Sequence, residues 1–385
     1  MKIIICPDSF KGSLSAIEAT EAIAQGIWFA YKPLKLTRKV ELVKIPLADG
    51  GEGTVEALVR ATNGRTNKVR VLDPLLRQIS SFYGISGDGK TAVLEMAAAS
   101  GLPLLKESER NPLITSTYGT GQLLLAAIKK GVEKIVIGIG GSATNDGGVG
   151  AMNALGAKFL DKHGVEIPPG GLVLAKLARI DVSEFKFPLN KIKVEVACDV
   201  TNPLCGKLGA STVFGPQKGA TPDMVKQLDA ALTNYAKILK KDLGKDVELM
   251  PGAGAAGGLG GGLAAFLNAK LRSGIDMVLD AADFDKALSN ADLVITGEGK
   301  IDEQTAYGKT IGGVLKRAAK YQVPVIAVAG SYQGNLQTLY QAGLRAVFSI
   351  INEPMPLDYA MQHAEKLLVQ LTENIMRSIG PILLK

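Results

Sequence analysis

Apolar runs that suit buried strands alternate with helix-like segments at both ends of this 385-residue chain. At the N-terminus, the apolar run from Lys2 to Ile5 precedes an alanine-rich segment, which Ser15 and Glu18 open as a capping box. A second pair follows, with a strand at 40–45 and a helix from Thr54 to Ala61. Such alternation predicts a parallel sheet covered by helices, because its strands must be buried on both faces.

The same alternation returns after residue 292. It predicts strands at 293–296, 323–329 and 346–351, helices at 311–319 and 336–342, and a terminal helix from Leu357. Two N-terminal strands are too few for a doubly wound sheet, whereas the C-terminal third supplies three more. We therefore expect one discontinuous α/β domain with a parallel sheet, built from residues 1–74 and 289–385.

The middle of the chain has a different pattern. Two strand-like runs, 78–86 and 91–96, flank the turn sequence Gly87-Asp88-Gly89-Lys90, which predicts an antiparallel hairpin. Further expected elements are strands at 135–139 and 193–197, and a long helix that begins after Thr221 and ends before Gly244. We expect residues 75–288 to form an inserted second α/β domain containing mixed or antiparallel strands.

Composition excludes several classes of protein. No apolar stretch approaches the roughly 20 residues that a membrane-spanning helix needs, so we expect no membrane partner. The net charge of +7 comes from 44 basic and 37 acidic residues that are mixed along the chain, so we expect no nucleic-acid partner. Three cysteines and two histidines favour neither a disulfide framework, a zinc site nor a Ser-His-Asp triad. The first residues suit a strand better than a signal peptide, which predicts a cytoplasmic protein.

Glycine-rich loops are the first candidates for binding chemistry. The chain has 45 glycines, and one cluster, residues 250–262, leads into an expected helix. Free amides and a helix N-terminus suit phosphate, so the candidate phosphate-binding residues are Gly252, Gly254, Gly257 and Gly258. Tight packing through small residues is an equal alternative for this cluster alone.

A second glycine-rich loop, residues 138–148, directly follows an expected strand. It is neither a Walker loop nor a dinucleotide fingerprint. Its hydroxyl, amide and carboxylate groups, on Ser142, Asn145 and Asp146, suit a phosphate, a metal ion or a hydroxylated substrate. The alternative is a turn in which Asp146 caps the following helix.

Three acidic loops also follow expected strands. They contain Asp49 and Glu52, then Asp199 and Asn202, then Glu298 and Asp302. Carboxylates at the carboxyl ends of parallel strands face the crevice where ligands bind, so several of them can bind Mg²⁺ or accept a hydroxyl proton. Each acid alone is also explained as a helix cap.

Two loops place a lysine among small residues. The turn after the first strand carries Asp8, Ser9 and Lys11, and residues 214–220 carry Lys218 between glycines. Either lysine can neutralise phosphate charge in a phosphoryl-transfer site. A solvated surface lysine is the alternative in both places.

Together these loops resemble those of the type 1 glycerate kinases of bacterial glycerate and sugar-acid catabolism. The similar stretches occur in order along the chain, at residues 8–15, 48–54, 138–148, 197–203, 209–220, 252–260 and 296–305. The resemblance implies a Rossmann-like or flavodoxin-like domain, interrupted by an inserted α/β domain, with the active site in the cleft. It also implies Mg²⁺ and ATP as cofactors, D-glycerate as the acceptor and 2-phosphoglycerate as the product.

The expected roles follow from phosphoryl transfer, in which the protein mainly positions reactants and offsets negative charge. Asp199 is the expected general base and Asn202 orients the acceptor hydroxyl, whereas Lys11 and Lys218 offset anionic charge. The expected Mg²⁺ ligands are Asp49, Glu52, Glu298 and Asp302. The residues expected to hold substrate or phosphate are Asp8, Ser9, Ser142, Asn145, Asp146, Gly252, Gly254, Gly257 and Gly258.

Two other functions stay open at this stage. The first is a kinase that forms 3-phosphoglycerate or acts on another small hydroxy acid. The second is a glycerate or nucleotide sensor without turnover, although several carboxylates would disfavour a pure anion sensor. The sequence leaves open whether the protein is a monomer or a homodimer.

Overall fold

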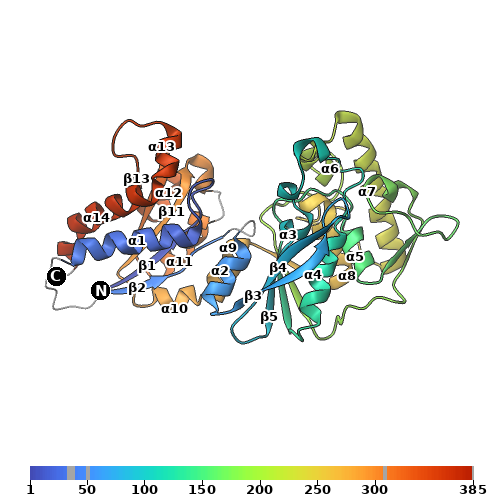
Figure 1. Ribbon diagram of the computed structural model, residues 1–385, viewed down its shortest axis with the longest axis horizontal. Coiled ribbons are helices and arrows are strands. Elements are labelled where there is room, and N and C mark those ends of the chain that lie inside the picture. The colour runs from blue at the N-terminus through green and yellow to red at the C-terminus, as the bar shows by residue number, and fades with distance from the viewer. Residues whose placement is uncertain (33–39, 49–52, 307–309, 384–385) are drawn as a thin grey trace. The chain divides into compact units, whose positions relative to one another are not determined.

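The computed structural model describes residues 1–32, 40–48, 53–306 and 310–383. By contacts the chain divides into two compact units. Unit 1 contains residues 1–49 and 275–385, and unit 2 contains residues 50–274. Unit 1 therefore combines both ends of the chain, as the blue and the orange-to-red ribbons in Figure 1 show.

Unit 1 has a five-stranded sheet in the order β13-β12-β11-β1-β2, and every paired neighbour in it is parallel. Its strands are β1 (Lys2–Pro7), β2 (Glu41–Lys44), β11 (Leu293–Ile301), β12 (Val325–Tyr332) and β13 (Leu344–Ser349). Its helices are α1 (Ala16–Tyr31), α9 (Gly274–Ala281, whose first residue belongs to unit 2), α10 (Phe284–Leu288), α11 (Thr310–Lys320), α12 (Gln337–Gln341), α13 (Leu357–Gln362) and α14 (Ala364–Leu383), with a 3₁₀ turn η6 (Glu303–Ala306).

Helices from the two ends of the chain cover one face of this sheet together. Helix α1 lies beside α14, as Figure 1 shows, and both contribute buried side chains to one core with alternate residues of β1, β11 and β12. The capping box at Ser15 and Glu18 is present at the start of α1. Ile3 and Ile5 of β1 and Leu368 of α14 are buried in this core. Burial of these apolar side chains joins the two ends of the chain in one unit.

Unit 2 has a six-stranded sheet in the order β10-β9-β6-β5-β4-β3 and a two-stranded sheet of β7 and β8. Its strands are β3 (Arg65–Leu72), β4 (Gln78–Ile85), β5 (Thr91–Glu95), β6 (Lys134–Gly138), β7 (Lys158–Leu160), β8 (Arg179–Asp181), β9 (Lys193–Ala197) and β10 (Lys270–Arg272). Its α-helices are α2 (Thr54–Ala61), α3 (Ala97–Ser100), α4 (Tyr118–Ile128), α5 (Val149–Ala154), α6 (Ala210–Phe214), α7 (Pro222–Leu243) and α8 (Leu259–Leu267). Its 3₁₀ turns are η1 (Leu102–Leu104), η2 (Glu107–Glu109), η3 (Leu172–Lys176), η4 (Pro216–Lys218) and η5 (Ala255–Gly258).

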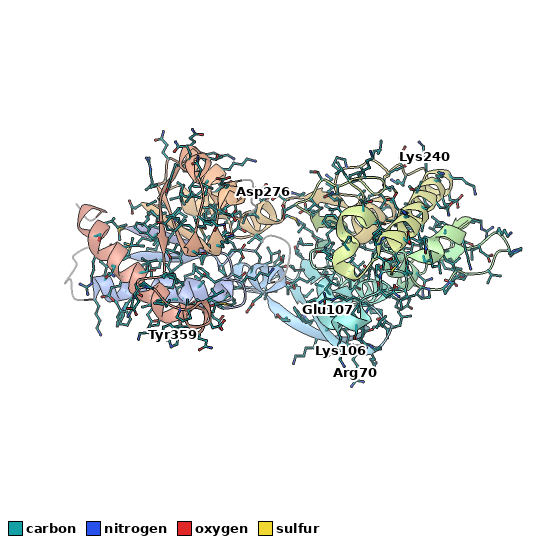
Figure 2. The ribbon with its side chains drawn as sticks, turned by 90° about the horizontal axis from the view of Figure 1, so that it is seen from above. Arg70, Lys106, Glu107, Lys240, Asp276 and Tyr359 are labelled. Carbon is teal, nitrogen blue, oxygen red and sulfur yellow. The ribbon has the colours of Figure 1, made fainter. Side chains whose placement is uncertain are left out.

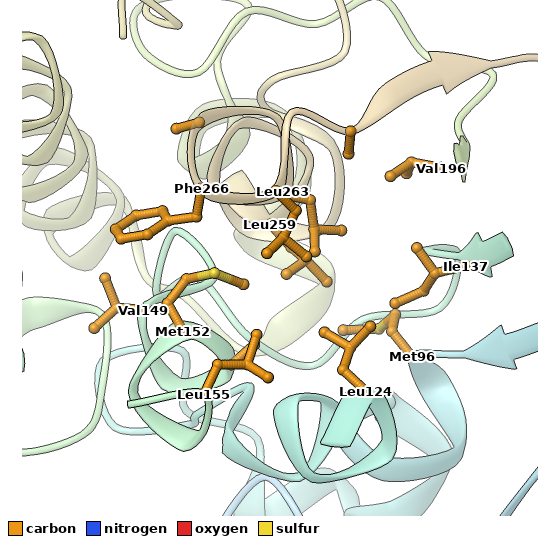
Figure 3. Close-up of a cluster of buried hydrophobic side chains, with 14 of the residues drawn as sticks. Met96, Leu124, Ile137, Val149, Met152, Leu155, Val196, Leu259, Leu263 and Phe266 are labelled. Carbon is orange, nitrogen blue, oxygen red and sulfur yellow. The ribbon is translucent and has the colours of Figure 1, made fainter. Parts of the chain in front are cut away.

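The main sheet of unit 2 is mixed. Strands β5, β6, β9 and β10 pair in parallel, whereas β3, β4 and β5 pair antiparallel. Helix α7 is capped by Thr221 and ends at Gly244, and Lys240 lies on its exposed side (Figure 2). A large apolar core fills the unit, including the side chains labelled in Figure 3: Met96, Leu124, Ile137, Val149, Met152, Leu155, Val196, Leu259, Leu263 and Phe266.

The expected fold class is confirmed, with a parallel sheet from both chain ends and a second α/β sheet that contains antiparallel strands. One expected element differs, since the terminal helix is divided into α13 and α14. The boundaries between the two units lie at residues 49–50 and 274–275, whereas the sequence-based division placed the domain boundaries at 74–75 and 288–289. Strand β3 pairs with β4 in unit 2, which explains the earlier boundary. Two independently folding domains stay a prediction.

No helix within the described ranges has the length and apolar character needed to cross a membrane.

Candidate functional site

In unit 1, the strand order reverses between the carboxyl ends of β1 and β11. From β1 the chain continues to β2 at one edge of the sheet, and from β11 it continues through β12 to β13 at the other edge. The direction of winding therefore reverses between two neighbouring strands. In open α/β sheets, ligands bind at such a reversal, outside the carboxyl ends of the strands.

Two predicted residues, Asp8 and Ser9, lie at this reversal. The Asp8 amide donates to the carbonyl oxygen of Gly297 in β11, at 2.8 Å. The Asp8 carboxylate accepts hydrogen bonds from the Ser9 amide and from the Thr310 hydroxyl at the start of α11, both at 2.6 Å. Thr310 was not predicted, because a single threonine gives no signal of its own. These bonds hold the Asp8 carboxylate at the strand ends.

The other predicted residues of unit 1 follow the same two strands. The Glu298 carboxylate accepts from the Thr305 hydroxyl at 2.9 Å, and Asp302 lies 3.5 Å from the ammonium of Lys300. Lys11 is exposed, and its backbone lies close to Gly299 in β11. A Cβ added to Gly299 would lie 3.3 Å from the Lys11 backbone nitrogen. The structure therefore brings the five predicted residues of unit 1 that it describes to the ends of β1 and β11.

The carboxylates at these strand ends are suitable for Mg²⁺. Mg²⁺ is usually held by one or two carboxylates together with substrate phosphates and water, and not by a complete protein cage. Among the side chains described, no group of three or more His, Cys, Asp or Glu residues is placed to hold a metal alone. Glu298 and Asp302 fit the first arrangement, whereas Asp49 and Glu52 lie outside the described residues.

Two of the predicted loops of unit 2 lie at the carboxyl ends of parallel strands. Strands β6 and β9 are neighbours, and they lead into the loops that carry Ser142 and Asp199. The Asp199 carboxylate accepts from the amide of Gly274, the first residue of α9, at 3.2 Å. The side-chain amide of Asn202 donates to the carbonyl of Leu208 at 2.8 Å, within its own loop. Asp199 and Asn202 are partly exposed, as ligand-binding side chains must be.

The glycine cluster 252–258 lies between these two loops and packs closely on both. A Cβ on Gly254 would lie 2.2 Å from the carbonyl oxygen of Pro203, and one on Gly257 would lie 2.0 Å from that of Thr144. The Gly254 amide already donates to the carbonyl of Asn202 at 3.0 Å. Close packing therefore explains why these positions are glycine. Their binding of phosphate stays a prediction.

Asp146 is completely buried and holds together the loop 138–148. Its carboxylate accepts from the amide and the hydroxyl of Thr117, at 2.7 and 2.8 Å, and from the amides of Gly148 and Gly150, at 3.1 and 3.2 Å. Burial raises the pKa of Asp146, and these hydrogen bonds oppose the increase. Thr117 was not predicted, although it stands in a Thr-Ser-Thr run just before α4, where polar side chains often cap helices.

Lys218 is buried beside Asp146 and is 1% exposed. Its ammonium donates to the carbonyl oxygen of Thr144 at 2.7 Å. Burial lowers the pKa of Lys218 to about 7, and the charge of Asp146 opposes this decrease. Asn145 is also fully buried, and its side-chain amide donates to Ser211 at 2.9 Å. The buried side chains of Asp146, Lys218 and Asn145 therefore support this loop from the interior of unit 2. Gly140 and Gly141 of the same loop are exposed.

The family model described as the glycerate kinase family matches residues 3–380. The chain belongs to the glycerate kinase family. The protein named glycerate kinase in Bacillus subtilis (strain 168) is 52% identical over 379 residues, covering 98% of both chains. The protein named glycerate 2-kinase in Escherichia coli (strain K12) is 48% identical over 99% of this chain and 98% of its own.

A solved structure agrees with this membership of the glycerate kinase family. The crystal structure of a candidate glycerate kinase 2 from Salmonella typhimurium LT2 matches with a TM-score of 0.89 and 49% identity. The match covers 99% of this chain and 98% of that chain. The family resemblance noted from the loops is confirmed over the whole chain.

The buried lysine of this family member predicts a pH dependence of stability. As the pH rises from about 7 toward 10.5, Lys218 loses its proton in the folded protein but stays charged in the unfolded chain, so unfolding takes up a proton. We therefore expect the free energy of unfolding of the wild type to rise with pH relative to that of Lys218→Met. Urea unfolding of both proteins at several pH values measures this difference. A difference that is constant or falls with pH would contradict the buried, neutral lysine.

Proposed function

We propose that this protein transfers the γ-phosphoryl group of ATP to D-glycerate and forms 2-phospho-D-glycerate. The observation that carries the proposal is similarity over nearly the whole chain to proteins named glycerate kinase, one of which is named glycerate 2-kinase. The predicted loops that carry Asp8, Ser142 and Asp199 also follow the carboxyl ends of parallel strands, where α/β proteins bind substrates.

In the proposed reaction, Asp199 accepts the proton of the glycerate 2-hydroxyl. The hydroxyl oxygen then forms a bond to the γ-phosphorus while the bond from that phosphorus to the β,γ-bridging oxygen breaks, which releases ADP. The hydrogen bond from the Gly274 amide holds the Asp199 carboxylate, and partial exposure leaves the carboxylate accessible to substrate. Asn202 lies in the same loop and orients the acceptor.

The residues of unit 1 bind the metal and the phosphates in this proposal. Glu298 and Asp302, with Asp49 and Glu52, would hold Mg²⁺, which neutralises charge on the phosphate oxygens when bound. Lys11 is exposed at the same strand ends and offsets further negative charge. Asp8 positions Ser9 through its hydrogen bond to the Ser9 amide.

The test is identification of the product. Purified protein is incubated with Mg²⁺, ATP and D-glycerate, and the products are resolved by phosphorus NMR. We expect ADP and 2-phosphoglycerate, with no ADP formation when glycerate is omitted. A 3-phosphoglycerate signal would replace the proposed regiochemistry, and tight binding of glycerate without ADP release would support a sensor instead.

The general base is tested by Asp199→Asn. We expect kcat to fall about 10²- to 10⁴-fold, because the amide cannot accept the proton. Asp223→Asn is the matched control, since Asp223 lies on the exposed surface of α7. Near wild-type turnover of Asp199→Asn, with an unchanged unfolding midpoint, would rule out this role.

Three further expectations stay predictions. The cytoplasmic location, the choice between a monomer and a homodimer, and the binding of phosphate by the glycines at 252–258 each need a measurement of their own.

A further inference from the structure

Arg110 is a partly buried cation that no protein group neutralises within the described ranges. Its guanidinium makes no hydrogen bond or ion pair with any described residue, and its Nε atom is buried without a partner. In contrast, Arg77 is paired with Asp73 and Glu109, at 2.6 and 2.7 Å. A buried guanidinium nitrogen without an acceptor is costly, because it has lost its hydration. The protein therefore keeps Arg110 at a cost in stability, which a bound anion would offset.

The position of Arg110 is fixed by the segments that hold the loop 138–148. A Cβ on Gly219 would lie 2.4 Å from the Arg110 carbonyl oxygen, so the backbone of Arg110 touches the residue after Lys218. A few residues further along the chain, the Thr115 hydroxyl donates to the carbonyl of Ala143 at 2.8 Å. Arg110 thus lies where the segment that carries Lys218 meets the segment that supports this loop.

Unsatisfied polar atoms are concentrated in the same part of unit 2. Six buried side-chain atoms have no hydrogen-bond partner among the residues described. Four of them belong to this region: Arg110 Nε, Thr144 Oγ1, Asn145 Oδ1 and the Tyr235 hydroxyl. The Tyr235 ring would lie 2.5 Å from a Cβ on Gly147, which places it against the same loop. Roughly 90% of buried polar groups are satisfied in native proteins, so this concentration marks the region as one that lacks protein partners for its polar groups.

We propose that Arg110 binds an oxyanion of a substrate in unit 2, either the carboxylate of glycerate or a phosphate oxygen of ATP. This proposal rests on the proposed function and adds a binding residue to it. A guanidinium binds either group through paired, charge-assisted hydrogen bonds. Thr144 and Asn145 are completely buried, so the contact with the substrate is assigned to Arg110 alone.

In this arrangement Lys218 is a positioning residue and Arg110 makes the contact with the anion. Lys218 is 1% exposed and directs its ammonium to the Thr144 carbonyl, so it supports the loop from inside. Arg110 keeps part of its side chain exposed, although its Nε is buried. The cation that a substrate meets is therefore Arg110.

The test uses Arg110→Gln and Arg110→Lys in the full chain, with Lys106→Gln as the matched control. Lys106 is exposed in the same segment (Figure 2), and its change removes the same charge. Calorimetry measures equilibrium binding of D-glycerate and of Mg²⁺-ATP separately, and steady-state kinetics give both KM values. We expect Arg110→Gln to weaken one ligand by roughly 10- to 100-fold, with Arg110→Lys intermediate and the control unchanged.

The affected ligand identifies the anion. Weaker binding of glycerate alone indicates the carboxylate, and weaker binding of ATP alone indicates a phosphate. Unchanged binding of both ligands in the folded variants would overturn the proposal. Equal loss for both ligands together with a lower unfolding midpoint, not rescued by Arg110→Lys, would also overturn it in favour of a structural role. If the wild type lacks glycerate-dependent ADP release, the proposed function fails, whereas the calorimetric comparison still tests Arg110.

Discussion

The candidate site of unit 2 depends on one buried carboxylate. Asp146 accepts four hydrogen bonds, from Thr117, Gly148 and Gly150, although it is fully removed from water. An ionised carboxylate is tolerated in such a place only when donors replace its hydration. The buried carboxylate therefore needs these donors, and its hydrogen bonds to them fix the path of the loop after β6.

The close packing of the glycine cluster follows from this constraint. With the loop fixed, the backbone at Thr144 leaves no space for a side chain at Gly257, and the Gly257 carbonyl accepts from the Gly147 amide at 3.0 Å. The cluster also touches the loop that carries Asn202, through the Gly254 amide. One buried carboxyl group thus links three chain segments that are distant in sequence. In unit 1, by contrast, the parallel sheet itself brings Asp8 and Glu298 to neighbouring strand ends.

Much of this fold was predictable from local patterns. Strand and helix periodicity predicted the five strands of unit 1 and its helices α1, α11 and α12, but not α9 and α10, and the turn at 87–90 predicted the β4–β5 hairpin. The placement of β3 in unit 2 was not predictable, because strand pairing is decided by partners far along the chain. For the site, glycine and acid patterns pointed to Asp8, Asp146 and Glu298, whose binding roles stay predictions. Burial has no local signal, so Lys218 was expected to contact an anion directly, and the unpaired state of Arg110 became visible only in three dimensions.

The role of Asp146 is tested most directly by hydrogen exchange and turnover of Asp146→Asn. An asparagine side chain offers one acceptor oxygen in place of two, so the amides of Thr117, Gly148 and Gly150 cannot all stay bonded. We expect these amides to exchange faster and glycerate-dependent ADP release to fall sharply, while the strand amides of unit 1 keep their protection. Unchanged exchange at these three amides together with wild-type turnover would contradict the central role of this carboxylate.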